Sequence, residues 1–255
     1  MKVVILAGGL GSRISEETYL KPKPMVTLGK QPILWHIMKK FSGQGFNDFI
    51  ICLGYKGEVI KEYFLNFKSY NSSFKTNTQS GELIVLDEGS EDWRVSLIDT
   101  GAQANTGERL KKVEKYLHDE SFFFTYGDGL TNQDLIATAT FHREKGKTVT
   151  LTAVNPPARY GAVSVNSGIV ENFSEKINST SSLINGGYFL VDPAVFETLN
   201  LVSNPSWELD ILPKLVEKRN LAAFEHTGFW YAMDTLRDKE YLEKLVESGS
   251  APWLK

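Results

Sequence analysis

Two groups of side chains in this sequence have the types and spacing for phosphate chemistry. The first follows an apolar run over residues 2–7, where Gly8, Gly9 and Gly11 precede Arg13. Glycines adopt unusual backbone torsions and let main-chain amides approach a ligand, and successive N–H groups can surround a phosphate. The guanidinium adds a permanent planar cation that matches phosphate oxygens. The pattern predicts a buried strand that ends in a phosphate-binding loop.

Two lysines extend this cationic stretch. Lys21 and Lys23 alternate with Pro22 and Pro24, and the prolines stiffen an extended segment. Several cations close together suit a polyphosphate better than a single phosphate. The dinucleotide pattern GxGxxG and the P-loop pattern GxxxxGKS/T both fit this stretch poorly. An ordinary tight turn explains the glycines alone equally well, and the cations beside them favour the phosphate-binding interpretation.

The second group is acidic. Asp128 lies between two glycines directly after the apolar run 122–126, so its carboxylate is expected at the carboxyl end of a buried strand, where open α/β sheets bind ligands. Mg²⁺ commonly uses one or two carboxylates together with water and phosphate oxygens, and Asp234 is a candidate second ligand. Asp128 also fits a turn, and Asp234, just before Thr235, fits the cap of the last helix. From the residues alone we favour the cap for Asp234.

The hydrophobic pattern predicts the elements that position these groups. Strand-length apolar runs alternate with segments of helical spacing in the first part of the chain, which implies parallel βαβ units. The second part is mostly strands separated by turns and ends in two helices, the first interrupted at Pro213. We expect strands at residues 2–7, 48–53, 82–86, 95–98, 121–126, 148–154, 162–165, 169–173 and 183–191, helices at 32–41, 59–64, 106–117, 133–144, 208–218 and 235–246, and a loop at 66–79.

Composition narrows the class of protein. The chain has 255 residues, of which 42% are hydrophobic and 23% are charged, and this fits one large folded domain with a substantial core. Its net charge of -3 argues against a general nucleic-acid or membrane-surface binder, because an anionic ligand must then meet local basic groups. Cys52 is the only cysteine and lies in an apolar run, so core packing is expected. No stretch reaches membrane-spanning length, and we expect a cytoplasmic enzyme.

The segment LAGGLGSR followed by KPKPM resembles the signature of the sugar-1-phosphate nucleotidyltransferases. The resemblance continues through GYKGEVIKEYF, DTG, FFTYGDG, INGGYF and GFWYAMDTLRDK, covers essentially the whole chain, and points to the glucose-1-phosphate cytidylyltransferase branch. It implies a Rossmann-like α/β fold with a mostly parallel mixed sheet flanked by helices and a smaller β-rich sugar-binding part. The single nucleotidyltransferase domain, 1–255, would divide into a mainly nucleotide-binding part, 1–146, and a mainly sugar-binding part, 147–255, with a C-terminal helix.

The resemblance also implies roles for particular residues. It places the Mg²⁺ ligands at Asp128 and Asp234, which reverses our preference for the cap, and it names Arg13, Lys23 and Asp128 as catalytic. The implied nucleotide contacts are Leu6, Ala7, Gly8, Gly9, Leu10, Gly11, Ser12, Arg13, Lys23, Thr100, Gly101, Arg109 and Gly127. The implied sugar-phosphate contacts are Tyr126, Glu175, Lys176, Asn185, Gly186 and Gly187.

Other interpretations of some of these residues stay open. Arg109 fits an exposed helical position, the pair at 175–176 fits a surface ion pair, and the glycines at 186–187 fit a β-bulge. The aromatic residues at 229–231 fit the core as well as the border of a sugar site. The chain departs from the family pattern at Thr27, Asp210 and Ile177, where relatives usually have an acidic residue, glutamate and proline. Neither the change at Thr27 nor that at Asp210 removes a catalytic group, whereas Ile177 bears on the shape of the loop after Lys176.

The implied reaction transfers a cytidylyl group from CTP to α-D-glucose 1-phosphate and yields CDP-glucose and pyrophosphate, with Mg²⁺ as cofactor. The implied context is the synthesis of CDP-linked deoxysugars for surface polysaccharide, including O-antigen and lipopolysaccharide, by a homo-oligomer. The same chemistry with another NTP or sugar 1-phosphate is an alternative. A nonenzymatic nucleotide-sugar sensor and a dinucleotide-dependent oxidoreductase are rivals from other classes, although the oxidoreductase needs a glycine spacing and a ribose-binding acid that are not evident.

Overall fold

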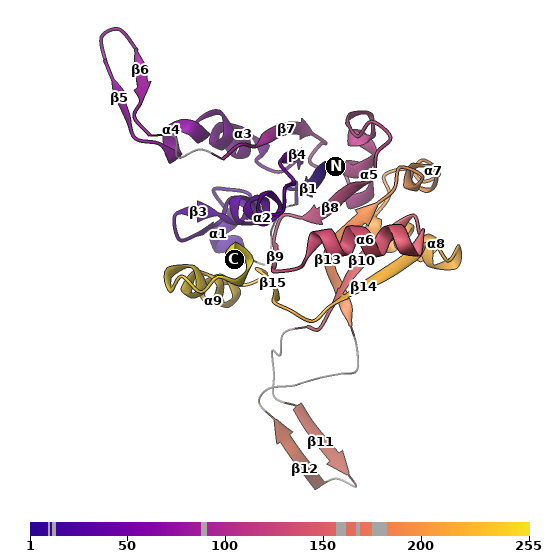
Figure 1. The fold of residues 1–255 in the computed structure, drawn as a ribbon. Coiled ribbons are helices and arrows are strands. Elements are labelled where there is room, and N and C mark those ends of the chain that lie inside the picture. Colours follow the sequence, from indigo (N-terminus) through magenta and orange to yellow (C-terminus); the bar gives the residue numbers. More distant parts are fainter. Residues whose placement is uncertain (10, 12–13, 88–90, 157–161, 167–168, 175–182) are drawn as a thin grey trace.

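A seven-stranded sheet forms the centre of the molecule (Figure 1). The computed structural model describes residues 1–9, 11, 14–87, 91–156, 162–166, 169–174 and 183–255. All strands of this sheet run parallel except β13, which is antiparallel to its neighbours β8 and β10. The strand order is β14 (Leu221–His226), β10 (Val149–Val154), β13 (Ile184–Val191), β8 (Phe122–Tyr126), β1 (Val3–Leu6), β4 (Asp48–Leu53) and β7 (Arg94–Asp99). The mostly parallel mixed sheet confirms the predicted fold class.

Both faces of the central strands are buried under helices, and successive strand residues point to opposite faces. In β1, Val3 and Ile5 join one apolar layer, whereas Val4 and Leu6 join the other. This explains why the central strands have apolar residues at nearly every position. The first layer is covered by α2 (Ile33–Ser42), α3 (Gly57–Leu65), α9 (Leu236–Glu247) and η5 (Pro252–Leu254), and the second by α5 (Thr106–Val113), α7 (Val195–Leu199), η4 (Trp207–Ile211) and α8 (Leu212–Glu217).

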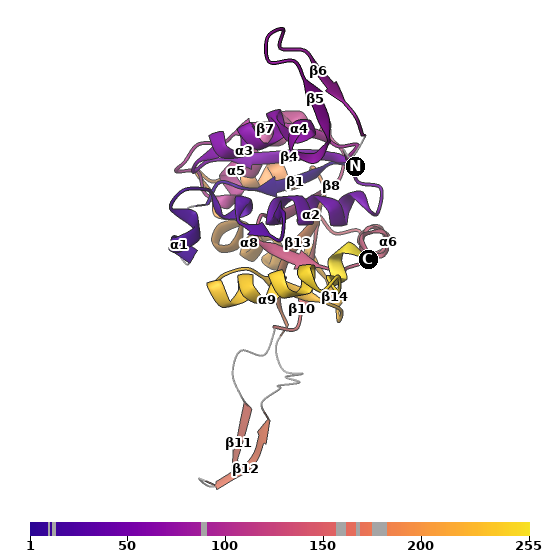
Figure 2. The same cartoon turned by 90° about the vertical axis from the view of Figure 1, so that its left-hand side faces the viewer.

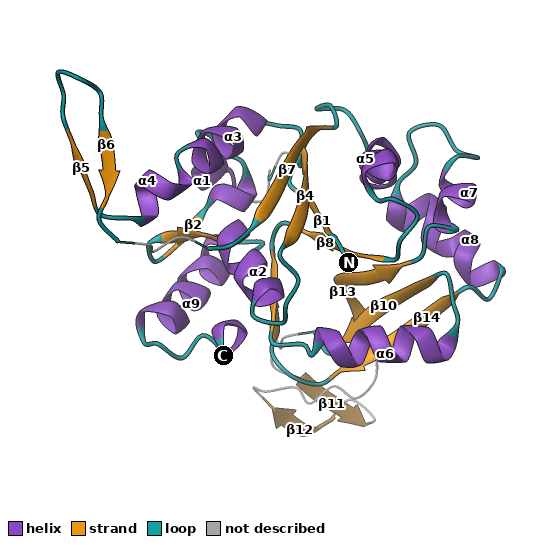
Figure 3. Cartoon of the chain, turned by 45° about the horizontal axis from the view of Figure 1, so that its top comes forward, coloured by secondary structure: helices purple, strands orange, loops and turns teal. Residues whose placement is uncertain are grey.

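The remaining elements are short or lie at the edges. Helix α6 (Leu135–Lys145) packs along β13 and β14 (Figure 3). Two β-ribbons stand away from the body, β5–β6 on one side and β11–β12 on the other (Figure 2). The short pairs and turns are β2 (Thr27–Leu28) with β3 (Gln31–Pro32), β5 (Phe74–Thr76) with β6 (Leu83–Val85), β9 (Gly129–Thr131) with β15 (Trp230–Ala232), β11 (Ala162–Asn166) with β12 (Ile169–Ser174), α1 (Ser15–Thr18), η2 (Lys23–Met25), α4 (Phe67–Asn71) and η3 (Glu114–Tyr116).

The loop prediction for residues 66–79 is wrong, because this segment contains α4 and β5. The ring of Phe67 packs against the rings of Tyr63, Phe64 and Trp93, with centroid distances of 5.5, 5.9 and 5.5 Å. These contacts join α4 to α3 and to the segment before β7, so the polarity of residues 66–79 did not reveal them. Elsewhere the predicted strands and helices are confirmed within a few residues, and the helix expected over 208–218 changes from π-helical to α-helical geometry at Leu212, just before Pro213.

In the parts of the chain that the structure describes, none of the helices combines the length and apolar character needed to cross a bilayer. Cys52 is fully buried in β4, as predicted. Burial raises the pKa of its thiol to about 12, so the reactive thiolate form is disfavoured. Cys52 is therefore a packing residue.

Candidate active site

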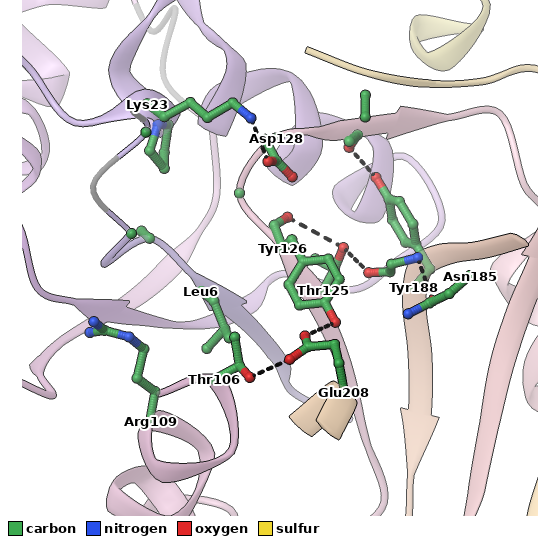
Figure 4. Close-up of a pocket in the computed structure, with 18 of the residues that line it drawn as sticks. Leu6, Lys23, Thr106, Arg109, Thr125, Tyr126, Asp128, Asn185, Tyr188 and Glu208 are labelled. Atoms are coloured by element: carbon green, nitrogen blue, oxygen red, sulfur yellow. Dashed lines mark hydrogen bonds and ion pairs between the residues drawn. The ribbon is translucent and has the colours of Figure 1, made fainter. Parts of the chain in front are cut away.

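A cavity of about 720 Å³ opens where the parallel strands end (Figure 4). β1 and β8 run parallel into it, and the residues that follow them, Ala7 and Gly127, lie on its wall. Because β13 is antiparallel, it brings its first residues, including Asn185, to the same edge of the sheet. Residues far apart in the sequence therefore meet at the carboxyl ends of the parallel strands, where open α/β sheets bind ligands.

The glycine loop after β1 forms one side of this cavity. Leu6, Ala7, Gly9 and Gly11 line it. A Cβ atom on Gly9 would have no atom within 4 Å, so its backbone is open to a ligand, and Gly11 has a φ of +62°, which favours glycine. Leu10, Ser12 and Arg13 lie outside the described residues. The described part of the loop thus has the open backbone that a phosphate site needs.

Gly8 lies behind this loop and contacts Arg109 rather than the cavity. A Cβ atom on Gly8 would lie 2.1 Å from Nη1 of Arg109, so only glycine fits. Arg109 lines the cavity but is 5% exposed. Its Nη1 donates to Leu53 O at 3.0 Å and to Thr100 Oγ1 at 2.7 Å, and its Nη2 donates to Gly8 O at 3.1 Å. The exposed-helix alternative for Arg109 is therefore wrong. The side chain is buried and donates hydrogen bonds to residues at the ends of β4, β7 and β1.

Thr100 and Gly101 lie behind the cavity wall. Thr100 is fully buried, and its hydroxyl donates to Leu53 O at 2.6 Å. Gly101 has a φ of +86°, and its N–H donates to Asp99 Oδ1 at 2.9 Å. Neither residue is part of the cavity lining. In this structure their contacts support Arg109 and the turn after β7, and burial lowers the pKa of the Arg109 guanidinium.

Lys23 bridges the two predicted metal ligands. Its Nζ lies 2.7 Å from Asp128 Oδ2 and 2.9 Å from Asp234 Oδ1. Burial alone would lower the pKa of the Lys23 ammonium, but the two carboxylates outweigh burial and raise it. Lys23 is therefore a firmly charged cation on the cavity wall. The turn η2, with Pro24 at its second position, holds this lysine against the end of β8.

The ribbon β9–β15 places Asp234 beside Asp128. The N–H of Met233 donates to Asp128 O at 2.9 Å, and Asp234 follows directly. The cap interpretation of Asp234 is wrong, because Thr235 caps α9 and forms a capping box with Asp238. The main-chain N–H of Asp234 donates to Asp238 Oδ2 at 3.0 Å. The cap thus fixes the backbone of Asp234 while its carboxylate faces Lys23.

The two carboxylates fit a Mg²⁺ ion in type and number. Both contact one cationic centre, the Lys23 ammonium, so both are aimed at a site of positive charge. Among the described residues no group of three or more His, Cys, Asp or Glu side chains forms a closed metal site. Mg²⁺ keeps several waters and substrate phosphate oxygens beside one or two carboxylates. An open pair of carboxylates at a phosphate-binding cavity matches that preference.

Strand β13 forms the opposite wall. Asn185, Gly186 and Gly187 line the cavity, and the pairing of β13 with β10 shifts register beside them, so the expected bulge is present. Gly187 has a φ of +74°, and a Cβ atom there would lie 2.6 Å from the Tyr126 ring. Trp230 also lines the cavity, and its Nε1 donates to Gly186 O at 2.6 Å. Glu175 and Lys176 lie outside the described residues.

Sequence reasoning missed Glu208 and its neighbours on this wall. The Glu208 carboxylate accepts hydrogen bonds from the Tyr126 hydroxyl and from Thr106 Oγ1, the latter at 2.7 Å (Figure 4). Burial, followed by the negative charge of Glu208, raises the pKa of Tyr126 far above its usual value, so the phenol stays neutral. An acidic residue in the first turn of a helix is common, so the sequence carried no signal that Glu208 faces a cavity. The other cavity residues without a predicted role are Pro24, Ala104, Asn105, Thr125, Gly129, Tyr188, Ser206 and Ala232.

The chain is similar in sequence to a known protein family and to individual relatives. Residues 2–243 match the family model described as nucleotidyl transferase. The glucose-1-phosphate cytidylyltransferase of Salmonella typhimurium is 51% identical over 256 residues, which cover 99% of this chain and 98% of that protein. A probable glucose-1-phosphate cytidylyltransferase of Bacillus subtilis is 40% identical over 253 residues, which cover 99% of each chain.

Solved structures share the fold. HddC from Yersinia pseudotuberculosis superposes with a TM-score of 0.70 at 23% identity, over 96% of this chain and 99% of that chain. A UDP-glucose pyrophosphorylase complexed with UDP-glucose superposes with a TM-score of 0.69 at 16% identity, over 97% and 98% of the two chains. The match to the family model and the relatives over nearly the whole length confirm the resemblance seen in the motifs: this chain belongs to the nucleotidyl transferase family.

Proposed function

We propose that this protein transfers a cytidylyl group from CTP to α-D-glucose 1-phosphate and forms CDP-glucose and pyrophosphate. The observation that carries the proposal is the cluster of Lys23, Asp128 and Asp234 beside the open glycine loop. It combines a charged lysine, two carboxylates and main-chain amides in one cavity at the carboxyl ends of the strands. The relative with 51% identity, named glucose-1-phosphate cytidylyltransferase, supports the choice of CTP and glucose 1-phosphate.

The reaction requires alignment and charge neutralisation more than a protein base. An oxygen of the sugar phosphate attacks the α-phosphorus of CTP, a new phosphoanhydride bond forms, and the bond to the β-phosphate breaks as pyrophosphate leaves. The attacking phosphate is already ionised, so binding both substrates in line supplies most of the catalysis. Lys23 neutralises negative charge on the α-phosphate, and the amides around Gly9 and Gly11 bind the triphosphate. Arg13 and Lys176 are assigned to the triphosphate and to the attacking phosphate.

Asp128 and Asp234 would hold a Mg²⁺ ion. Mg²⁺ supplies neutralisation of phosphate charge and an additional anchor for the triphosphate. The protein's part is to keep the two carboxylates fixed, Asp128 through the end of β8 and Asp234 through the cap of α9. Lys23 lies between them and meets the same demand for positive charge. We therefore expect turnover to require both the divalent ion and Lys23.

The test is pyrophosphate release with four NTPs, each combined with several sugar 1-phosphates, with and without Mg²⁺. Selective release with CTP and glucose 1-phosphate supports the full proposal. Release with a different pair retains the reaction type and replaces the substrates. Equilibrium binding of nucleotide without any release would instead support a nucleotide-sugar sensor. Chelation of the divalent ion is expected to stop release in the active pair.

We also propose that the protein is a homo-oligomer. Leu83, Ile84 and Leu86 on and beside β6 are 48, 49 and 64% exposed, and among the described residues β6 pairs with β5 alone, which leaves its other edge open. An uncharged apolar edge strand on a ribbon that stands away from the body is an unfavourable surface for a monomer. A second copy of the chain presents the same self-complementary edge.

Light scattering should give a multiple of the chain mass, and Ile84→Lys should reduce the measured mass. An Ile84→Lys protein with the wild-type mass would exclude this surface.

A further inference from the structure

Glu208 is a carboxylate of the cavity wall for which the proposed reaction has no role. It lies in η4, on the side of the cavity opposite Lys23 and Asp128 (Figure 4). One carboxylate oxygen accepts from the Tyr126 hydroxyl. The other accepts from Thr106 Oγ1 at 2.7 Å and from Ser206 Oγ at 3.0 Å. A single negative charge therefore orders three hydroxyl groups from three segments of the chain.

The Tyr126 ring packs against the bulge of β13. Gly187 approaches the ring so closely that a Cβ atom would lie 2.6 Å from Cδ2 of Tyr126. The N–H of Gly187 donates to Asn185 Oδ1 at 2.9 Å, and its carbonyl accepts from Thr125 Oγ1 at 2.9 Å. The orientation of the Asn185 amide and of the Gly187 peptide thus depends on where the Tyr126 ring lies.

The attachment of α5, by contrast, depends only partly on Glu208, through the hydrogen bond from Thr106. The N–H of Glu108 donates to Pro205 O at 3.1 Å, and Asn105 donates two hydrogen bonds of 2.9 Å to Asn204, from its main-chain N–H to Oδ1 and from Nδ2 to the carbonyl oxygen. Removing the charge of Glu208 would leave these contacts in place, and with them Arg109 on the nucleotide side. The consequence of losing Glu208 is therefore expected on the wall formed by β13.

We propose that Glu208 is a positioning residue for the sugar phosphate: it holds the Tyr126 ring, and through the ring the Asn185 and Gly187 groups, in the orientation that the sugar meets. The inference rests on the proposed function, since it assigns the β13 wall to the sugar. Hydrogen bonds to a charged acceptor are stronger and more directional than neutral ones. The Tyr126 hydroxyl donates its one hydrogen bond to Glu208. Its oxygen can therefore act only as an acceptor toward Asn185 or a substrate hydroxyl.

Steady-state kinetics of Glu208→Gln test the proposal, because glutamine keeps the shape and removes the charge. The KM for glucose 1-phosphate should rise roughly ten- to a hundredfold, while the KM for CTP changes less than about twofold. Glu217→Gln is the matched control, since it makes the same change at an exposed residue of the following helix, α8, outside the cavity lining. It should leave both KM values unchanged. Glu208→Asp should restore part of the sugar affinity.

A double-mutant cycle separates positioning from a general structural effect. If Glu208 acts through Tyr126, then Tyr126→Phe should raise the same KM, and Glu208→Gln combined with Tyr126→Phe should be no worse than the stronger single variant. Fully additive effects, an unchanged sugar KM in Glu208→Gln, or an equal rise in the CTP KM would each overturn the proposal. A wild-type protein that releases no pyrophosphate with any substrate pair would contradict the proposed function itself, whereas an active wild type with unaltered Glu208→Gln contradicts only the role of Glu208.

Discussion

Single residues decide the charge balance of the cavity, and Lys23 is the clearest case. Buried lysines tend to lose their proton, yet Asp128 and Asp234 raise the pKa of Lys23 and keep it charged. Asp128 and Asp234 lie 105 and 211 residues from Lys23 in the sequence. The residue types were visible in the sequence, whereas the ion pairs depend on how β8 and the β9–β15 ribbon are placed.

Asp128→Asn should reduce turnover on the order of 10²-fold or more, because it removes one of the two carboxylates that would hold the Mg²⁺ ion. Asn is nearly isosteric, and Asp234 remains to pair with Lys23, so the fold should persist. The measurement is kcat for pyrophosphate release together with the thermal unfolding midpoint. Asp119→Asn is the matched control, since Asp119 is exposed and has a φ of 54°, which asparagine tolerates. Near-normal turnover of Asp128→Asn would exclude the assigned role.

At the scale of elements, β13 shows how one antiparallel strand builds a wall of the site. Its direction brings Asn185 to the edge where the neighbouring parallel strands end. Its register shift lets the backbone of Gly187 reach φ +74° against the Tyr126 ring. The strand itself was predictable from its apolar pattern. The direction was not, because pattern alone does not distinguish a parallel from an antiparallel partner.

Gly187→Ala should cost about 2–4 kcal/mol of unfolding free energy, the sum of left-handed backbone strain and a steric clash. Gly81→Ala is the matched control: Gly81 has the same φ of +74°, but a Cβ atom there meets nothing within 4 Å. We expect about 1 kcal/mol for that variant, from backbone strain alone. Urea unfolding of both proteins gives the comparison. Equal losses of unfolding free energy would show that the clash with Tyr126 does not contribute to the destabilisation.

The wrong loop prediction for residues 66–79 also has its explanation at the scale of elements. Residues 66–79 were expected to form a loop because Asn, Ser and Thr are frequent there. In the structure Asn66 and Asn71 donate side-chain hydrogen bonds to Glu62 O and Phe67 O, at 2.9 and 2.8 Å, so polar residues support helix ends. The stabilising contacts are those of the Phe67 ring with Tyr63 and Phe64 in the preceding helix and with Trp93. The contact with Trp93 joins distant parts of the chain, so a local window of sequence does not reveal it.

At the scale of the whole molecule, the two parts of the chain share one sheet and one C-terminal anchor. Strands β14, β10 and β13 from residues 147–255 form one side of the sheet, and β8, β1, β4 and β7 from residues 1–146 form the other. The pairing of β13 with β8 joins them into one continuous hydrogen-bonded sheet, and we propose on this basis that the chain is a single domain. The C-terminal Trp253 is 1% exposed and donates through Nε1 to His36 Nδ1 at 3.2 Å. His36 Nε2 in turn donates to Leu28 O at 3.0 Å. The last residues are thereby attached to α2, on the first apolar layer.

This anchor predicts a pH dependence of stability. Burial lowers the pKa of His36 below its ordinary value of 6.5 and outweighs the hydrogen bond to Leu28 O, which raises it. As the pH falls below about 6.5, the unfolded chain takes up the proton first, so the free energy of unfolding decreases. Urea unfolding between pH 7.5 and about 5 should show this loss, and His36→Gln should have a shallower slope. His226, whose pKa burial also lowers, accounts for a residual slope. Identical slopes in both proteins would contradict the role of His36.

The sequence by itself determined the features that depend on neighbouring residues: the buried strands, the glycine loop, most helices and the family motifs. Apolar periodicity and backbone freedom are local properties, so these could be predicted. Only the tertiary structure decided that Arg109 is buried under Gly8, that Thr235 rather than Asp234 caps α9, and that Glu208 faces the cavity. These outcomes depend on contacts between segments distant in the chain. Such contacts arise from sheet order and strand direction, which residue type and spacing do not specify.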